Sequence, residues 1–164
     1  MYEKAEISVL GMKLIAIDPG RKTGMIMLEI QHNQNPKPIA YATHDPFDVV
    51  TALEHFARED SGEVNSTTRV VIEKYVPREG VHGKDDTAQT VIGMILQWSR
   101  DNGVEPIFQM PSERAMVTTA VLQNLGLWLK GHDNRHIMDA ARHAVTWLVK
   151  MRHHNTMSKG WRRG

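Results

Sequence analysis

The sequence contains no cysteine, which excludes a disulfide framework and any zinc site built from thiolates. No apolar run reaches the length of a membrane span, and the first residues, MYEKAEISVLGMK, lack the long apolar core of a signal peptide. The chain also has no internal repeat and no low-complexity tract. We therefore expect a globular protein of a reducing, cytoplasmic compartment, with no membrane partner.

A chain of 164 residues with 41% apolar composition can form one globular domain with its own core. We expect an N-terminal extension at residues 1–11, the domain at residues 12–151 and a basic tail at residues 152–164. The net charge is +1, but basic residues outnumber acidic ones from position 129 onward. This asymmetry indicates either a polyanionic partner or a solvated tail. The tail has few apolar residues, so we expect no stable packing there.

Five short apolar segments have the composition of β-strands. Residues 12–18, 23–30 and 38–43 follow one another across polar links, which predicts an antiparallel meander. A helical segment precedes the strand RVVIE at residues 69–73, which implies a crossover and a parallel pairing. EPIFQM at residues 105–110 is a further strand. The predicted fold class is α/β, with a mixed five-stranded sheet and helices on both faces.

The first two helices are predicted from an N-terminal signal and from apolar spacing. Asp45 and Pro46 are the residue types of an N-cap and a first helical position. The second helix, residues 87–100, has Gly93 in its interior, where glycine costs about 1 kcal/mol relative to alanine. Close packing of another helix would explain this glycine. The apolar stripes that should face the sheet are Phe47, Val50, Leu53 and Ala57 in the first helix and Val91, Ile95 and Trp98 in the second.

Two more helices are expected in the C-terminal third. Ser112 is a candidate cap for a helix from Glu113 toward Leu122. After the break GLWLKGHDN, Asn134 or Asp133 caps a last helix that runs to about residue 151. The apolar face of this last helix is rich in alanine, which lets its backbone pack close to the sheet: Ile137, Ala141, Ala144, Val145 and Leu148.

The stretch LIAIDPGRKTG places an acid, Asp18, at the end of an apolar strand. Asp-Pro-Gly is a common β-turn sequence, because Asp accepts amide hydrogen bonds, Pro fixes φ and Gly tolerates positive φ. The alternative is that Asp18 is functional, because α/β proteins bind ligands at the carboxyl ends of their strands. The motif alone does not separate a turn from a site.

A second acid, Glu73, also ends a buried, β-branched strand. If the two strands are neighbours, Asp18 and Glu73 emerge at the same edge of the sheet. Two carboxylates close together repel unless a cation joins them or one of them takes a proton. Oxygen ligands of this kind suit Mg²⁺ or Mn²⁺.

The last helix carries His136, Asp139 and His143 at positions i, i+3 and i+7, which places them on one narrow stripe. Taken alone, this stripe is an ordinary His–Asp pair with surface polarity. Together with Asp18 and Glu73, it favours a metal site. His143 lies farther along the helix and is either an outer-shell partner that orients a water or ligand, or a helix-surface residue.

An apolar strand ending in DPG, a second strand ending in Glu and a late helix opening with HxxDA resemble the RuvC family of Holliday-junction resolvases. The resemblance extends over residues 12–150 and is closest to a divergent, phage-type member. It implies the ribonuclease H-like fold and an endodeoxyribonuclease that acts in DNA recombination and repair, in a bacterial or phage-infected cell. The implied substrate is branched DNA, most of all the Holliday junction.

The resemblance also implies the residues of the catalytic site. The family's four acidic metal positions map onto Asp18, Glu73, His136 and Asp139, with His136 standing where many relatives have an acid. The implied cofactor is Mg²⁺ or Mn²⁺, two ions per active site, with Asp18 as the bridging ligand. Imidazole is a softer ligand than carboxylate, which favours Mn²⁺. Symmetric cleavage of two strands needs two active sites, so we expect a homodimer. The helix at residues 87–100 is either its interface, as in the family, or an ordinary core helix.

Nucleic-acid contacts are expected from an aromatic residue and from basic residues around the site. Tyr75 stands where the family has a junction-contacting aromatic, but the following VPREG departs from the family pattern. The family's catalytic lysines have no clear counterpart, and Arg114 and Lys130 are the nearest candidates. Arg78 and Lys84 complete the set of predicted phosphate contacts, which should be sensitive to salt.

Three other functions fit parts of the pattern. A flap, stem-loop or RNA-processing nuclease of the same fold would share the DPG strand and the acidic site. An actin-like ATPase or sugar kinase also places an acid and glycines after a strand, but it needs a second domain and a second glycine-rich phosphate loop. A non-enzymatic DNA-binding protein would have lost ligand positions, and here all four are filled.

Overall fold

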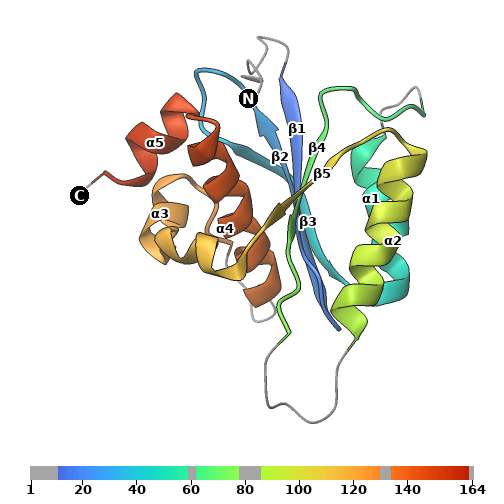
Figure 1. The fold of residues 1–164 in the computed structure, drawn as a ribbon. Coiled ribbons are helices and arrows are strands. Elements are labelled where there is room, and N and C mark those ends of the chain that lie inside the picture. The colour runs from blue at the N-terminus through green and yellow to red at the C-terminus, as the bar shows by residue number, and fades with distance from the viewer. Residues whose placement is uncertain (1–10, 59–61, 78–85, 130–133, 163–164) are drawn as a thin grey trace.

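The computed structural model describes residues 11–58, 62–77, 86–129 and 134–162 (Figure 1). Within these residues, a five-stranded sheet stands between two layers of helices. No helix in the described part of the chain is long and apolar enough to cross a membrane. The elements are β1 Met12–Asp18, β2 Thr23–Ile30, β3 Lys37–His44, a 3₁₀ helix Pro46–Asp48, α1 Val49–Ala57, β4 Arg69–Glu73, α2 Thr87–Asp101, β5 Pro106–Gln109, a 3₁₀ helix Pro111–Met116, α3 Thr119–Asn124, α4 Arg135–Lys150 and α5 His154–Gly160.

The strand order is β3-β2-β1-β4-β5. The first three strands form an antiparallel meander, and β4 and β5 are added parallel to β1. This confirms the predicted α/β class and the mixed five-stranded sheet. The register pairs Ile17 with Ile72, so the next residues of β1 and β4, Asp18 and Glu73, leave the sheet at one edge.

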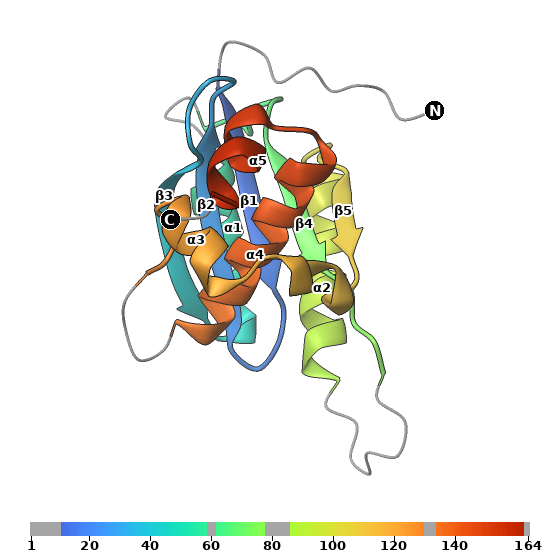
Figure 2. The ribbon, with the colours of Figure 1, turned by 90° about the vertical axis from the view of Figure 1, so that its left-hand side faces the viewer.

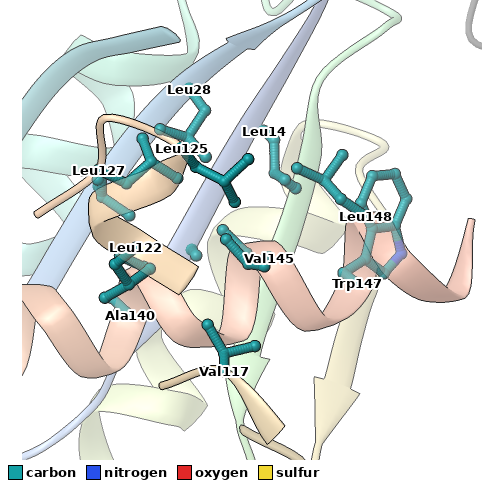
Figure 3. Close-up of a cluster of buried hydrophobic side chains, with 14 of the residues drawn as sticks. Leu14, Leu28, Val117, Leu122, Leu125, Leu127, Ala140, Val145, Trp147 and Leu148 are labelled. Carbon is teal, nitrogen blue, oxygen red and sulfur yellow. The ribbon is translucent and has the colours of Figure 1, made fainter. Parts of the chain in front are cut away.

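The two faces of the sheet bury separate apolar clusters. On one face, α1 and α2 cover the side chains of β1 and β4 that include Ile15 and Ile72. On the other face, α3 and α4 cover the alternate side chains, which include Leu14 and Val71 (Figures 1 and 3). A central strand that is covered on both faces needs apolar residues at every position, which explains the unbroken apolar runs of β1 and β4.

Helix α4 is the main element of the second layer and contacts β1, β2 and β4. Its predicted apolar face is buried, and its three alanines Ala140, Ala141 and Ala144 are completely covered. Small side chains let the helix axis approach the sheet, so residues in its first turns come close to the carboxyl edge of β1. The prediction of this helix is confirmed almost to the residue.

The prediction of which side chains of the first helix face the sheet is partly wrong. Phe47, which was expected to face the sheet, is 88% exposed, while Val49 and Phe56 are buried. The chain opens with a 3₁₀ helix at Pro46–Asp48, and α1 begins only at Val49. A 3₁₀ turn has three residues per turn and not 3.6, so it shifts which side chains point inward.

The helix expected from Glu113 toward Leu122 is interrupted. A 3₁₀ helix ends at Met116, Val117 is extended, and α3 begins at Thr119. The carbonyl oxygen of Val117 accepts a hydrogen bond from Arg142 of α4, with an Nε–O distance of 3.1 Å. This long-range contact replaces an intrahelical one, and the N-cap of α3 is Thr118, not Ser112.

The glycine inside α2 packs against none of the residues that the structure describes. Gly93 lies on the exposed face of α2, and a Cβ atom added there would meet no atom within 4 Å. Packing inside the described part of the chain therefore does not explain Gly93, and the interpretation of this helix face as ordinary core packing is wrong. The stripe of Val91, Ile95 and Trp98 is buried as predicted.

The C-terminal segment is not the unpacked tail that its composition indicates. Residues 154–160 form α5, which packs against α3 and α4. His153 caps the helix through Thr156, and Nδ2 of Asn124 donates to the carbonyl oxygen of Gly160 at 2.9 Å. Packing uses the small residues Thr156 and Gly160, which are buried, so a search for large apolar residues misses it.

We predict that removal of the chain after Met151 destabilises the protein by roughly 1–3 kcal/mol, a fall in melting temperature of about 3–10 °C. The loss of α5 uncovers Val121 of α3 and Leu125 just after it, whose side chains would lie 3.2 and 3.5 Å from a Cβ atom added at Gly160. Thermal unfolding of the truncated and complete chains measures this. An unchanged melting temperature would contradict the packing of α5.

The double variant K159A/R162A is the matched control, because it removes two charges and leaves the buried face of α5 intact. If these residues contact DNA phosphates, affinity falls and the salt slope falls by about one unit per contact, while the melting temperature stays constant. Equal affinity and an equal slope in variant and parent would show that Lys159 and Arg162 are only solvated.

Candidate active site

The carboxylates of Asp18 and Glu73 meet at the carboxyl edge of the sheet, as the ends of parallel neighbours β1 and β4. Glu73 is in turn paired in register with Gln109, the last residue of β5. The amide nitrogen of Lys74 donates to the carbonyl oxygen of Gln109 at 2.7 Å and extends this pairing by one residue. The three strand ends therefore form a fixed base for the side chains above them.

Helix α4 can lie against this edge of the sheet because residue 24 of β2 is a glycine. Gly24 pairs with Asp18 across β1 and β2. A Cβ atom built on Gly24 would lie 2.2 Å from the backbone carbon and oxygen of His136 and 2.6 Å from the backbone nitrogen of Ile137. Only the absence of a side chain permits this contact between β2 and the first turn of α4. The contact places His136 and Asp139 beside the strand ends.

Asp18 is buried and bonded to the first turn of α4. Its Oδ2 lies 3.0 Å from Nδ1 of His136. Burial, with the negative charge of Glu73 next in effect, raises the pKa of Asp18 to about 6, although the hydrogen bond from His136 acts in the opposite direction. Asp139 also raises it. Asp18, Glu73 and Asp139 are thus close enough to repel one another, which is the situation that a cation relieves.

Glu73 is held by a side chain of α4 and by one from the 3₁₀ helix Pro111–Met116. Its Oε2 lies 2.6 Å from Nε2 of His143 and 3.0 Å from Nε of Arg114. Burial alone would raise the pKa of Glu73, but the hydrogen bond from His143 and the charge of Arg114 outweigh burial and lower it. Glu73 therefore loses its proton at a lower pH than Asp18 does.

Asp139 is paired with two arginines. Its Oδ1 contacts Nη1 of Arg114 and lies 2.9 Å from Nη1 of Arg142. Arg142 is itself anchored on the carbonyl oxygen of Val117, and Arg114 spans Asp139 and Glu73. Arg114, expected at the DNA interface, thus lies inside the acidic cluster and partly neutralises it.

The geometry brings together most of the predicted site. Asp18 and His136 are in direct contact, and Glu73 and Asp139 are linked through Arg114. Within the described residues, no three His, Asp or Glu side chains are already grouped as a metal site. The donor set still fits a divalent cation, because burial and the negative charges of Glu73 and Asp139 together raise the pKa of Asp18, and a cation bound there would offset that cost.

One alternative from the sequence is contradicted. His143 is completely buried, so the interpretation as a helix-surface residue is wrong. Helix α5, which carries Lys159, lies at the far end of α4, a helix of 16 residues that spans about 24 Å, away from the carboxyl edge of β1 and β4 (Figures 1 and 2).

Of the predicted nucleic-acid contacts, Tyr75 is half-buried in the segment that follows β4. Arg78, Lys84 and Lys130 lie outside the described residues.

The sequence reasoning did not identify Gly24, Gln109 and Arg142 as members of this site. Arg142 stands three residues after Asp139 on α4, a spacing that permits an ion pair and could have been noticed. Gln109 ends β5 just as Glu73 ends β4, and the pairing of these ends follows from the parallel sheet. The close approach of Gly24 to α4 has no signal in the sequence beyond the glycine itself.

No protein-family model matches this chain, and no curated protein matches it in sequence. Similar folds occur among solved structures. RuvC of Thermus thermophilus superimposes with a TM-score of 0.62 and 17% identity, covering 87% of this chain and 98% of its own. The same protein in complex with a Holliday junction substrate gives 0.60 and 17%, with coverage of 86% and 97%. Fowlpox virus resolvase, in complex with substrate Holliday junction DNA, gives 0.56 and 13%, with coverage of 84% and 99%. The chain therefore has the ribonuclease H-like fold of these proteins.

Proposed function

We propose that this protein is a divalent-metal-dependent endonuclease that cleaves branched DNA, with the Holliday junction as its preferred substrate. The observation that supports this most is the acidic cluster of Asp18, Glu73 and Asp139 at the carboxyl edge of a resolvase-like sheet. The superposition includes 98% of the Thermus thermophilus RuvC chain and 99% of the fowlpox virus resolvase chain. The similarity in fold therefore extends over nearly the whole of each of these proteins.

The proposed metal ligands are Asp18, Glu73, His136 and Asp139, for Mg²⁺ or Mn²⁺, with two ions per active site. Bound in pairs, such ions generate the attacking nucleophile and stabilise the leaving oxygen of a phosphodiester. Three other residues of the chain hold the proposed ligands near one another. Gly24 permits the close approach of α4, His143 forms a hydrogen bond with Glu73, and Arg142 forms an ion pair with Asp139.

Arg114 has two uses in this proposal. In the metal-free protein its guanidinium neutralises Glu73 and Asp139. Its side chain is 27% exposed, so it can turn outward to a DNA phosphate when a cation takes its place. Tyr75, Arg78, Lys84 and Lys130 remain proposed DNA contacts.

We also propose a homodimer, because a Holliday junction has two strands to cut and a twofold axis supplies two sites. The exposed face of α2 supports this placement, since a Cβ atom added at Gly93 would meet no atom of the described residues within 4 Å. A glycine that internal packing does not require is available for the close approach of a partner helix.

A cleavage panel with four-way, flap, Y-shaped and RNA stem-loop substrates tests the function, with Mg²⁺ or Mn²⁺ present. The proposal expects paired, symmetric nicks in the four-way junction and slower cleavage of the others. Faster cleavage of flap or RNA substrates would assign a different nuclease function to the same site. ATP hydrolysis without nuclease activity would overturn the proposal.

We predict activity with Mn²⁺ at least equal to that with Mg²⁺ and none with Ca²⁺. Replacing His136 by aspartate should shift the preference toward Mg²⁺ by about tenfold, because carboxylate is a harder ligand than imidazole. The ratio of cleavage rates in the two metals measures this. His154→Asp is the matched control, since His154 is exposed on α5 and distant from the site. An unchanged ratio in His136→Asp would show that His136 is not a ligand.

A further inference from the structure

Behind Glu73 lies a buried pair of polar side chains, Gln109 of β5 and His143 of α4. Gln109 is 1% exposed and His143 is completely buried. The two imidazole nitrogens have different partners: Nε2 lies 2.6 Å from Oε2 of Glu73, and Nδ1 lies 2.8 Å from the side-chain amide of Gln109. Residues far apart in the sequence are thus joined in one line from β5 through α4 to β4.

The amide of Gln109 satisfies its surroundings in only one orientation. Its nitrogen then donates to Nδ1 of His143 at 2.8 Å and to the carbonyl oxygen of His143 at 3.2 Å, and its oxygen accepts from the backbone nitrogen of Trp147 at 3.3 Å. The opposite orientation would set the amide oxygen against the carbonyl oxygen of His143. Because a buried unsatisfied polar group is costly, the first orientation is favoured.

This orientation determines where the imidazole carries its proton. A neutral imidazole has one donor and one acceptor nitrogen. Since Nδ1 accepts from Gln109, the proton is on Nε2, and Nε2–H donates to Oε2 of Glu73. Both nitrogens of His143 are then occupied, so His143 serves Glu73 and does not itself bind a cation.

We infer that Gln109 is a positioning residue that fixes the tautomer of His143 and thereby aims the carboxylate of Glu73 into the acidic cluster. The link to metal binding rests on the proposed function. With Oε2 held by His143, rotation of the Glu73 carboxylate is restricted, and Oε1 is left to face the other donors. Partners of this kind behind a ligand typically contribute 10–100-fold to metal affinity.

The backbone supports the same assignment. Gln109 pairs with Glu73 in the sheet register, and its carbonyl oxygen accepts from the amide of Lys74. The main chain of Gln109 therefore cannot shift independently of Glu73. The side chain of Gln109 is delivered to His143 by the same strand pairing that sets the position of Glu73.

The first test reads the tautomer directly in the metal-free protein, with long-range ¹H–¹⁵N spectra of the imidazoles. The unchanged chain should show His143 protonated at Nε2 alone. Gln109→Glu keeps the size but presents only acceptors, so Nδ1 should become protonated. Gln109→Met keeps the volume and removes the donor, which should leave a mixture of tautomers. Gln123→Glu, at an exposed position of α3, is the control and should leave His143 unchanged.

The second test is Mn²⁺ binding by calorimetry without DNA. Gln109→Glu and Gln109→Met should weaken binding by 10–100-fold, and Gln123→Glu should not. The inference would be overturned if Nδ1 of His143 were protonated in the unchanged chain. It would also be overturned if the Gln109 variants kept both the tautomer and the Mn²⁺ affinity of the unchanged chain. If the unchanged chain bound no Mn²⁺ but the tautomer still followed residue 109, the metal-dependent function would fail and the role of Gln109 in holding His143 would stand.

Discussion

Replacing Asp18 by asparagine should reduce cleavage of a four-way junction by on the order of 10³-fold or more, with DNA affinity unchanged. Asp18 is the proposed bridging ligand at the end of the central strand, whereas DNA binding depends on basic residues elsewhere. Single-turnover cleavage and a binding titration in Ca²⁺ measure the two effects separately. A variant with full cleavage would remove the metal-centred proposal.

The same substitution should stabilise the metal-free protein at neutral pH. Asp18 has a folded pKa of about 6, against an ordinary value of 3.8, so the folded protein holds this proton more tightly than the unfolded chain. Stability is therefore lost as the pH rises from about 3.8 to about 6, and the full penalty is present above pH 6. Asparagine has no such penalty, and the expected gain at pH 7.5 is roughly 1–3 kcal/mol, less the lost bond to His136.

Melting temperatures in a metal chelator, measured from pH 4 to pH 8, test this effect. The difference between Asp18→Asn and the unchanged chain should grow with pH and level off above about pH 6. Asp45→Asn is the control, because Asp45 is exposed and forms its ion pair with Lys22 at the surface. If the difference in melting temperature did not change with pH, burial and the neighbouring charges would not raise the pKa of Asp18.

The part of the fold that the sequence predicts is the part set by local apolar patterns. The apolar runs before Asp18 and Glu73 predicted buried strands, and the helical segment between them predicted a crossover and a parallel pairing. The alanine-rich face of α4 likewise predicted a helix packed close to the sheet. These features depend on neighbouring residues in the sequence, and the structure confirms them.

The remaining features depend on contacts between distant segments. The interruption before α3 reflects a hydrogen bond from Arg142 to Val117, and α5 is held by Asn124 and by the small residues Thr156 and Gly160. Neither has an apolar period that a sequence reading can detect. The same holds for Glu73: the acid was recognisable, but Arg114 and His143, which orient it, come from other elements.

The second large effect is expected for Gly24→Ala. The new Cβ atom would lie 2.2 Å from the backbone of His136, and ordinary contacts begin at about 3.4 Å, so α4 and β2 must separate by more than about 1 Å. The obstacle is main chain, which cannot turn away as a flexible side chain can. Overpacking of this kind typically costs 1–3 kcal/mol.

In Gly24→Ala, the cleavage rate should fall by a larger factor than the loss of folding stability alone would cause. Residues His136, Asp139 and His143 are all carried by α4, so one displacement moves two proposed ligands and the side chain that holds Glu73. A misplacement of about 1 Å can reduce a rate by 10²-fold, and here several groups move together. We therefore expect a loss of at least about 10²-fold in cleavage, and weaker Mn²⁺ binding, in a variant that still folds.

Gly20→Ala separates this effect from a general cost of losing a glycine. Gly20 lies in the turn between β1 and β2, and a Cβ atom there would meet only the carbonyl oxygen of Lys22, at an ordinary 3.5 Å. Its melting temperature should stay within about 1 °C of the unchanged chain, while that of Gly24→Ala falls by several degrees. If Gly24→Ala instead melted and cleaved like the unchanged chain, α4 would not rest on β2 as described. The convergence of His136 and Asp139 on Asp18 would then need another cause.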